Sequence, residues 1–286
     1  AHPCSESSLQ AVIEATHRKI IVPTLVGPAA KIASMLEALG ESTDRYCIID
    51  EPHSHAAAAR AVTLVREGKA QLLMKGSLHT DELMHEVTSK EQGLRTAQRI
   101  SHVFILDVPT YHKPLYITDA AINIFPTLAD KVDIVKNAVE LAHALGVELP
   151  KVAILSAVET VTPKIPSTIE AAALCKMAER GQITGAIIDG PLAFDNAISA
   201  DAARTKGFQS PVAGDPDILV VPDLEAGNML AKQLTFLLKA ECAGIVLGAR
   251  VPVVLSSRAD SVSNQVVSCA IGALLAHAQQ RKLQLK

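Results

Sequence analysis

The chain has 286 residues, a formal net charge of -3 and 49% hydrophobic residues, which is typical of a globular protein with one or two substantial cores. It contains no Trp and only 3% aromatic residues, so platforms for stacking nucleic-acid bases are nearly absent. The negative charge also disfavours general binding to a phosphate backbone. No apolar run approaches the roughly 20 residues that span a bilayer. We therefore expect neither a nucleic-acid-binding protein nor a membrane protein.

The first ten residues, AHPCSESSLQ, have neither the basic nor the apolar region of a signal peptide. They also lack an initiator Met, so the sequence is consistent with a trimmed or excised piece. The five cysteines form no C-x-x-C pair, and four of them fall within or beside apolar stretches: Cys47, Cys175, Cys242 and Cys269. This pattern predicts a cytoplasmic protein with reduced, mostly buried thiols.

Apolar segments that resemble strands alternate with helical patterns along most of the chain. The first series has strands at 19–25, 44–50 and 71–76, followed by helical segments at 28–39, 53–67 and 80–87. The second series has strands at 102–108, 151–157, 185–190, 217–223 and 243–249. A strand at 251–255 and a helix at 260–281 end the chain, and Ser167 with Glu170 suggests a capping box within the second series. The alternation predicts a parallel sheet covered by helices.

We expect an α/β fold with two α/β domains and a cleft between them. Domain I comprises residues 1–100 and 257–286, and domain II comprises residues 101–256, because a new strand series starts near 95–102. Ligands of open α/β sheets bind at the carboxyl ends of strands, so polar residues at those positions are the candidates for a site.

The segment after the strand at 71–76 is the first candidate. It offers a lysine, a glycine, two hydroxyls and a histidine: Lys75, Gly76, Ser77, His79 and Thr80. Glycine lets a ligand approach the backbone, and amides at a helix start can hold an anion beside the lysine. These five residues are predicted to bind substrate. The alternative is an ordinary helix that Thr80 caps beside a surface lysine.

Two further strand ends carry carboxylates. Asp119 and Asn123 follow the segment LYIT and are predicted to line the site, although a solvated edge explains them almost as well. Asp189 and Asp195 surround the dipeptide Gly190-Pro191, which turn chemistry alone explains. Because no cluster of His, Asp and Glu accompanies the two aspartates, we expect no metal site and no permanently bound cofactor.

The segment at 248–261, GARVPVVLSSRADS, is the strongest candidate by chemistry. Ser256, Ser257, Arg258 and Asp260 follow its short apolar strand. A helix starting near Ala259 would direct amides toward an anion, and arginine supplies a forked donor that suits phosphate. Asp260 would then stabilise the first helical turn, so a capped helix without a ligand remains an alternative.

Several familiar motifs are absent from the sequence. It has no G-x-x-x-x-G-K-[ST] segment, no G-x-G-x-x-G after a strand and no G-x-S-x-G. A P-loop kinase, a protein with the usual dinucleotide fingerprint and a nucleophile-elbow hydrolase are therefore disfavoured.

Five segments together resemble the phosphate acetyl/butyryltransferase family over essentially the whole chain. They span residues 59–80, 115–127, 154–199, 217–234 and 243–261, and their form is closer to the butyryltransferase branch. The resemblance implies a cytoplasmic enzyme that interconverts acyl-CoA and phosphate with acyl phosphate and free coenzyme A. It also implies an isocitrate/isopropylmalate dehydrogenase-like architecture, a homodimer and direct transfer of an acetyl or butyryl group in a ternary complex.

By this resemblance, Ser257 and Arg258 match the active-site pair of the family. Arg258 is expected to hold the phosphate, and Ser257 to contact the thiol or the developing oxyanion. The general base of the acetyl branch is replaced here by Asn264, and the Lys of the butyryl branch by Gln265. Asp260 is therefore the catalytic carboxylate that we predict. A weakly catalytic protein that binds coenzyme A or acyl phosphate is the alternative, and a metal-dependent dehydrogenase is disfavoured.

Overall fold

The computed structural model describes residues 1–207, 209–255 and 260–284. The chain divides into two compact units, one formed by Ala1–Gln98 with Ala243–Lys286 and the other by Arg99–Cys242. Unit 1 thus resumes 14 residues earlier than the expected start at 257. The reason is strand pairing, because β10 (Val253–Val254) pairs in parallel with β3 (Leu73–Met74) of unit 1.

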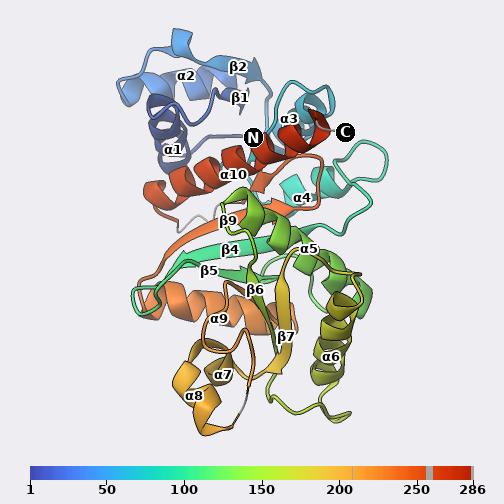
Figure 1. The fold of residues 1–286 in the computed structure, drawn as a ribbon. Coiled ribbons are helices and arrows are strands. Elements are labelled where there is room, and N and C mark those ends of the chain that lie inside the picture. Colours follow the sequence, from blue (N-terminus) through green and yellow to red (C-terminus); the bar gives the residue numbers. More distant parts are fainter. Residues whose placement is uncertain (208, 256–259, 285–286) are drawn as a thin grey trace. The chain divides into compact units, whose positions relative to one another are not determined.

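Unit 1 contains two small groups of strands and five longer helices in its described part. β1 and β2 pair in parallel, while β10 lies between β3 and the antiparallel strand β9. Helix α10 lies beside α1, and Ala11, Ala15, Val266 and Cys269 form the core between them (Figure 1). The elements are α1 (Glu6–His17), β1 (Thr24–Gly27), α2 (Ala29–Ala38), η1 (Thr43–Arg45), β2 (Cys47–Asp50), α3 (Ser54–Arg66), β3, α4 (Thr80–Thr88), β9 (Glu241–Leu247), β10 and α10 (Val262–Gln284).

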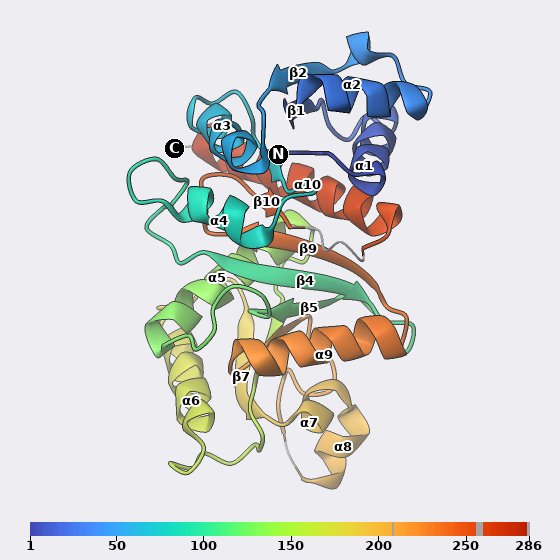
Figure 2. The same cartoon turned by 180° about the vertical axis from the view of Figure 1, so that it is seen from behind.

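Unit 2 is built on strands in the order β4-β5-β8-β6-β7. The last four are parallel, whereas β4 runs antiparallel to β5. Its elements are β4 (Ser101–Asp107), β5 (Leu115–Thr118), α5 (Leu128–Ala144), β6 (Lys151–Leu155), α6 (Pro166–Glu179), β7 (Ile187–Leu192), α7 (Phe194–Ile198), α8 (Ala200–Thr205), β8 (Ile218–Val220) and α9 (Leu224–Leu237). Helices α9 and α5 cover opposite faces of these strands (Figures 1 and 2).

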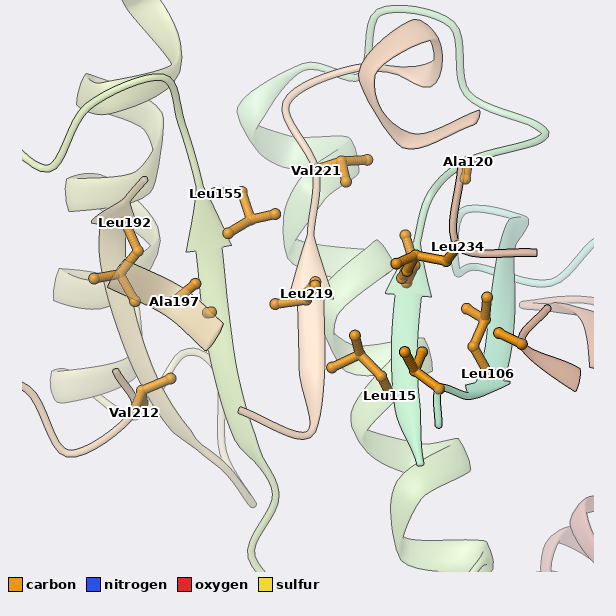
Figure 3. Packing of buried hydrophobic residues seen from close by; sticks show 14 residues of the cluster. Leu106, Leu115, Ala120, Leu155, Leu192, Ala197, Val212, Leu219, Val221 and Leu234 are labelled. Carbon is orange, nitrogen blue, oxygen red and sulfur yellow. The ribbon is translucent and has the colours of Figure 1, made fainter. Parts of the chain in front are cut away.

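The core of unit 2 is aliphatic, with one leucine from each strand. These are Leu106, Leu115, Leu219, Leu155 and Leu192, in the order of the strands, and all are buried (Figure 3). Leu234 of α9 packs against this face. Parallel strands that are covered on both faces read as continuous apolar runs, which is the pattern that the sequence shows.

The expectation of a parallel sheet holds for most strand pairs and is wrong at two of them. β4 is antiparallel to β5, and β9 is antiparallel to β10. The connections at 108–114 and 248–252 explain both cases. A parallel crossover needs about a dozen residues or more, whereas a short loop returns the chain antiparallel.

Other local expectations are also corrected. Helix α6 has Ile165 as its N-cap, because Ser167 is hydrogen-bonded to Ser156 instead (Oγ–Oγ, 2.8 Å). The capping box that the structure shows is formed by Thr127 and Asp130 at α5. The Gly190-Pro191 dipeptide lies inside β7 and forms no turn.

The cysteines differ in their exposure. Within the described residues the five thiols form no disulfide, and Cys269 is buried as expected. Cys47, in β2, is exposed, so the expectation of a buried thiol is wrong for it. Among the described helices, none combines the length and the apolar character needed to cross a bilayer.

Candidate active site

The segment after β3 is organised around Lys75, whose residue surface is only 4% exposed. Its Nζ donates hydrogen bonds to the carbonyl oxygens of Gly76 (3.3 Å) and Leu78 (3.2 Å). The backbone N–H of Lys75 also donates to the Val254 carbonyl of β10 (3.0 Å). The ammonium group therefore shapes the loop at the carboxyl ends of β3 and β10, in addition to any contact with a ligand.

Gly76 and Ser77 lie against the first residues of the chain. The Gly76 N–H donates to the Ala1 carbonyl (2.8 Å), and a Cβ at Gly76 would lie 2.4 Å from the His2 carbonyl oxygen. Ser77 Oγ donates to that same oxygen (3.0 Å) and accepts from the Cys4 N–H (3.1 Å). From the sequence, we expect Gly76 to let a ligand come close to the backbone. In the structure, the backbone of residues 1 and 2 lies at that position.

His79 and Thr80 end this segment, and both are exposed. His79 occupies the N-cap position of α4, and the helix begins at Thr80. Thr80 is therefore the first helical residue and not the cap that was expected. The two side chains remain accessible at the start of a helix, where the positive end of the helix dipole favours an anion.

The chain beyond β10 is described again from Asp260. Ser257 and Arg258, the predicted catalytic pair, lie outside the described residues, as do Ser256 and Ala259. Helix α10 begins at Val262, so Asp260 precedes the helix and is not in its first turn. Ser261 Oγ accepts the Asn264 N–H (3.1 Å), a capping contact that the expected start near Ala259 did not foresee.

In unit 2, Asp119 and Asn123 form a buried loop at the carboxyl end of β5. The Asp119 carboxylate accepts the backbone N–H groups of Ala121 (2.9 Å), Ile122 (3.0 Å) and Asn123 (3.1 Å). It also accepts the side-chain amide of Asn123, which donates as well to the Ile100 carbonyl (2.9 Å). Burial raises the pKa of the Asp119 carboxyl above its usual value, while these donors act in the opposite direction.

Both side chains are almost fully enclosed, so the interpretation of a solvated edge is wrong for them. Their hydrogen bonds fix the conformation of the loop that follows β5. The loop is also joined to helix α9, because the Leu224 N–H at the start of that helix donates to the Ile124 carbonyl (3.1 Å). Asp119 and Asn123 thus position the backbone and the neighbouring side chains at the carboxyl end of β5.

Arg99 is a residue of this edge that motif reasoning missed. Its Nε donates to Asn123 Oδ1 (2.7 Å), and its Nη1 lies 3.4 Å from Asp130 Oδ1. Roughly half of its side chain is exposed, at 52%. No signal in the sequence could have found it, because its place beside the end of β5 depends on β4 running antiparallel to β5.

The aspartates considered for a metal have other partners. Asp189 Oδ1 accepts the Gly190 N–H (2.9 Å), and Asp195 pairs with Lys206 (3.1 Å). Among the described residues, no group of three or more His, Cys, Asp and Glu side chains could hold a metal ion.

The structure therefore groups the candidates by unit. In unit 1, the loop at 75–80 adjoins the end of β10, from which the chain continues toward the Ser-Arg pair. In unit 2, Arg99, Asp119 and Asn123 form one hydrogen-bonded set. Each set includes a basic side chain, Lys75 in unit 1 and Arg99 in unit 2, and a basic side chain suits an anionic substrate.

Comparison with known proteins decides the family. A model described as phosphate acetyl/butaryl transferase matches residues 48–273. The chain belongs to this family. It is a phosphate acyltransferase that acts with short acyl chains.

Relatives are similar over nearly the full chain. A phosphate acetyltransferase of Rhizobium meliloti is 65% identical over 285 residues, which cover 100% of this chain and 90% of that protein. A phosphate butyryltransferase of Clostridium acetobutylicum is 44% identical, with coverage of 95% and 90%. Among solved structures, a branched-chain phosphotransacylase from Enterococcus faecalis V583 aligns with a TM-score of 0.82 at 33% identity and covers 97% of both chains.

The family predicted from the sequence is confirmed. These identities do not support the expectation that the chain is nearer to the butyryltransferase branch. Relatives named phosphate acetyltransferase reach 65% and 54% identity, whereas the butyryltransferase reaches 44%.

Proposed function

We propose that the acyl group is acetyl and that the second substrate is coenzyme A. The reaction is then acetyl-CoA plus phosphate giving acetyl phosphate plus coenzyme A. The observation that carries this proposal is the 65% identity to a phosphate acetyltransferase over the whole chain. A cytoplasmic location and an isocitrate/isopropylmalate dehydrogenase-like architecture remain proposals, the second supported by the α/β character of each unit.

In the proposed step, a phosphate oxygen attacks the thioester carbonyl carbon and forms a tetrahedral intermediate. Its collapse breaks the carbon–sulfur bond, and the leaving thiolate takes up a proton. In the reverse direction the thiol, with a pKa near 8.5, must lose its proton before it attacks acetyl phosphate. Transfer within a ternary complex needs neither a metal nor an acyl-enzyme intermediate.

The roles of individual residues follow from the family resemblance and from local structure. Arg258 binds phosphate and Ser257 stabilises the oxyanion, for which one good donor contributes about 3 to 4 kcal/mol. Asp260 is the proposed proton acceptor, because the side-chain amide of Asn264 is not basic. The backbone N–H of Asn264 donates to Ser261 Oγ at the start of α10. Lys75, Gly76, Ser77, His79 and Thr80 form the proposed loop at the phosphate end of the substrate.

Asp119 and Asn123 support a proposed anion-binding group within unit 2. They hold the half-exposed Arg99 beside the loop that follows β5. An arginine with two of its donors already fixed by protein acceptors loses little further freedom when it binds a phosphate group. The phosphate groups of coenzyme A supply such an anion.

A homodimer is also proposed. Helix α9 exposes Met229, Phe236 and Leu237, with Phe236 and Leu237 64% and 76% exposed. Exposed apolar side chains that cluster on one element are typical of a protein interface. Sedimentation at micromolar concentration tests this proposal, and a monomer under those conditions contradicts it.

The activity is tested by phosphate-dependent release of coenzyme A from acetyl-, propionyl- and butyryl-CoA. We expect the highest kcat/KM with acetyl-CoA and no release when phosphate is omitted. One methylene is worth about 1 to 3 kcal/mol in a pocket, so the preference should be on the order of 10-fold or more. A higher kcat/KM with butyryl-CoA contradicts the acetyl assignment but leaves the family activity intact.

A further inference from the structure

Helices α3 and α4 lie side by side in unit 1 (Figures 1 and 2). Helix α3 follows β2 and begins at Ser54, and α4 follows β3 and begins at Thr80. The start of α4 is also the end of the loop at 75–80, which is the proposed loop at the phosphate end of the substrate. The group that holds the first turn of α4 therefore determines where this loop ends.

The start of α4 receives no side-chain cap from its own N-cap residue. His79 occupies that position, and its side chain forms no cap hydrogen bond within the first turn, all of which the structure describes. At α3 the equivalent residue does cap the helix, because His53 Nδ1 accepts the backbone N–H of Ala56 (3.2 Å). A helix start is held by a group from elsewhere when the N-cap side chain supplies no acceptor.

Glu82, the third residue of α4, supplies such a group. Its carboxylate accepts hydrogen bonds from the Ser54 hydroxyl and from the backbone N–H of His79. Its Oε2 is buried and lies 3.6 Å from Nδ1 of His55. The bond to the N–H of the N-cap residue is one half of a capping box, whereas Ser54 and His55 are the first two residues of α3. One carboxylate thus joins the starts of both helices.

The Glu82 side chain is enclosed at this junction. It is 13% exposed, whereas the side chain of His55 is 74% exposed. Burial raises the pKa of a carboxyl group, but the hydrogen bond from Ser54, together with His55 and His79, outweighs burial and holds the pKa of Glu82 below its usual value. Glu82 is therefore a charged acceptor at neutral pH. Because an enclosed acceptor is costly to leave without its donors, the two helix starts stay together.

We propose that Glu82 is a positioning residue for phosphate binding, which fixes the start of α4 against the start of α3 and so holds the loop at 75–80. The inference rests on the proposed function of that loop. Glu82 acts through the loop and does not contact the phosphate, because two negative charges repel each other. The first N–H groups of α4 are the groups that it positions, and such groups favour a phosphate anion. Glu82 therefore affects the binding of phosphate and acyl phosphate, and not that of acyl-CoA.

The test compares Glu82→Ala and Glu82→Gln with Glu86→Ala in the full chain. Glu86 lies one turn further along α4, so its variant is the matched control. Steady-state kinetics give the KM for phosphate at saturating acyl-CoA and the KM for acyl-CoA at saturating phosphate. We expect Glu82→Ala to raise the KM for phosphate by about 10-fold or more and to change the KM for acyl-CoA by less than about 2-fold. Glu86→Ala should change neither.

The conservative variant separates positioning from a general loss of structure. Glu82→Gln keeps an acceptor for Ser54 and His79 but loses the negative charge, so it should recover part of the phosphate affinity. It also carries the test if Glu82→Ala does not fold, with an expected rise in the phosphate KM of roughly 3-fold or more. Thermal unfolding of each variant shows whether it is folded.

Two results overturn the inference. One is a phosphate KM in the Glu82 variants that equals that of Glu86→Ala. The other is an equal rise in the KM for both substrates, which indicates a general structural role. A parent chain that releases coenzyme A without phosphate contradicts the proposed function itself. An active, phosphate-dependent parent with unchanged phosphate affinity in the Glu82 variants contradicts only the role of Glu82.

Discussion

Asp119 accepts both the backbone and the side-chain amide of Asn123, and Asn123 in turn accepts the Nε–H of Arg99 (2.7 Å). The carboxylate, the amide and the guanidinium thus form a single chain of hydrogen bonds at the edge where β5 ends.

Asp119→Ala should lower the free energy of unfolding by roughly 2 to 4 kcal/mol, because three backbone donors and one amide lose their acceptor in a buried loop. Urea titration measures the change. Asp201→Ala is the matched control, since its carboxylate pairs with Arg204 on an exposed surface and should contribute less than about 0.5 kcal/mol. Equal effects in both variants would show that the Asp119 network does not stabilise the loop.

The ion pair between Lys131 and Glu170 should behave asymmetrically. The Lys131 side chain is 5% exposed and that of Glu170 is 31% exposed. Glu170→Leu leaves a buried ammonium group without its carboxylate and should cost about 3 kcal/mol or more. Lys131→Met should cost less, and the double variant should recover part of the loss of the glutamate variant. A double-mutant cycle by urea titration with no coupling contradicts this prediction.

His102 should make stability depend on pH. Burial lowers its pKa to about 3, from an ordinary value of 6.5. Between these values the unfolded chain binds a proton that the folded chain does not, so the contribution of His102 to stability falls as the pH falls from about 6.5 toward 3. The slope approaches about 1.4 kcal/mol per pH unit.

The measurement is the free energy of unfolding from pH 7 to pH 4 in the parent and in His102→Gln, which lacks this titration. We expect a shallower acid-side slope in the variant. Phe104→Leu is the control, because Phe104 packs edge-on against His102 (4.3 Å between ring centroids) and carries no proton. A slope that is unchanged in His102→Gln argues against the shifted pKa.

Gly76→Ala should displace the loop that contains the proposed substrate residues. The added Cβ would lie 2.4 Å from the His2 carbonyl oxygen, a backbone atom that cannot rotate away. We expect lower stability by roughly 1 to 3 kcal/mol, the range for overpacking, and a lower kcat/KM. Gly68→Asn is the control, since no atom lies within 4 Å of the position of its Cβ, and Asn tolerates the positive φ there. An unchanged kcat/KM in Gly76→Ala would show that the loop at 75–80 does not contribute to catalysis.

Arg258→Ala should raise the KM for phosphate and lower kcat, with little loss of stability. Loss of a charge-assisted phosphate contact of about 1.5 to 3 kcal/mol corresponds to roughly 10- to 100-fold in kcat/KM. Arg258→Lys should recover only part of the activity, because an ammonium lacks the forked geometry. Arg204→Ala serves as an arginine control from the exposed face of α8. Unchanged phosphate kinetics in Arg258→Ala would place the phosphate elsewhere.

The sequence predicted the helices well because their signals are local. The helical segments at 28–39 and 53–67 agree closely with α2 (Ala29–Ala38) and α3 (Ser54–Arg66). Helical period and end signals depend on residues within a few positions of each other. The capping box at Ser167 was wrong because Ser156, the residue after β6, hydrogen-bonds to the same hydroxyl.

The substrate and catalytic roles of the candidate residues stay predictions, whereas the family and the α/β class were accessible from the amino-acid sequence alone. The directions of β4 and β9 were not, because the direction of a strand depends on its connections and on the strand beside it. The structural contacts of Lys75, Gly76 and Asp119 could not be predicted from the sequence either. Lys75 and Asp119 hydrogen-bond to groups of their own loops, whereas Gly76 packs against residues that are distant in the chain. Only the folded chain brings these groups into contact and removes them from water. Because a buried polar group needs a hydrogen-bond partner, the tertiary structure decides which polar groups stabilise the loops.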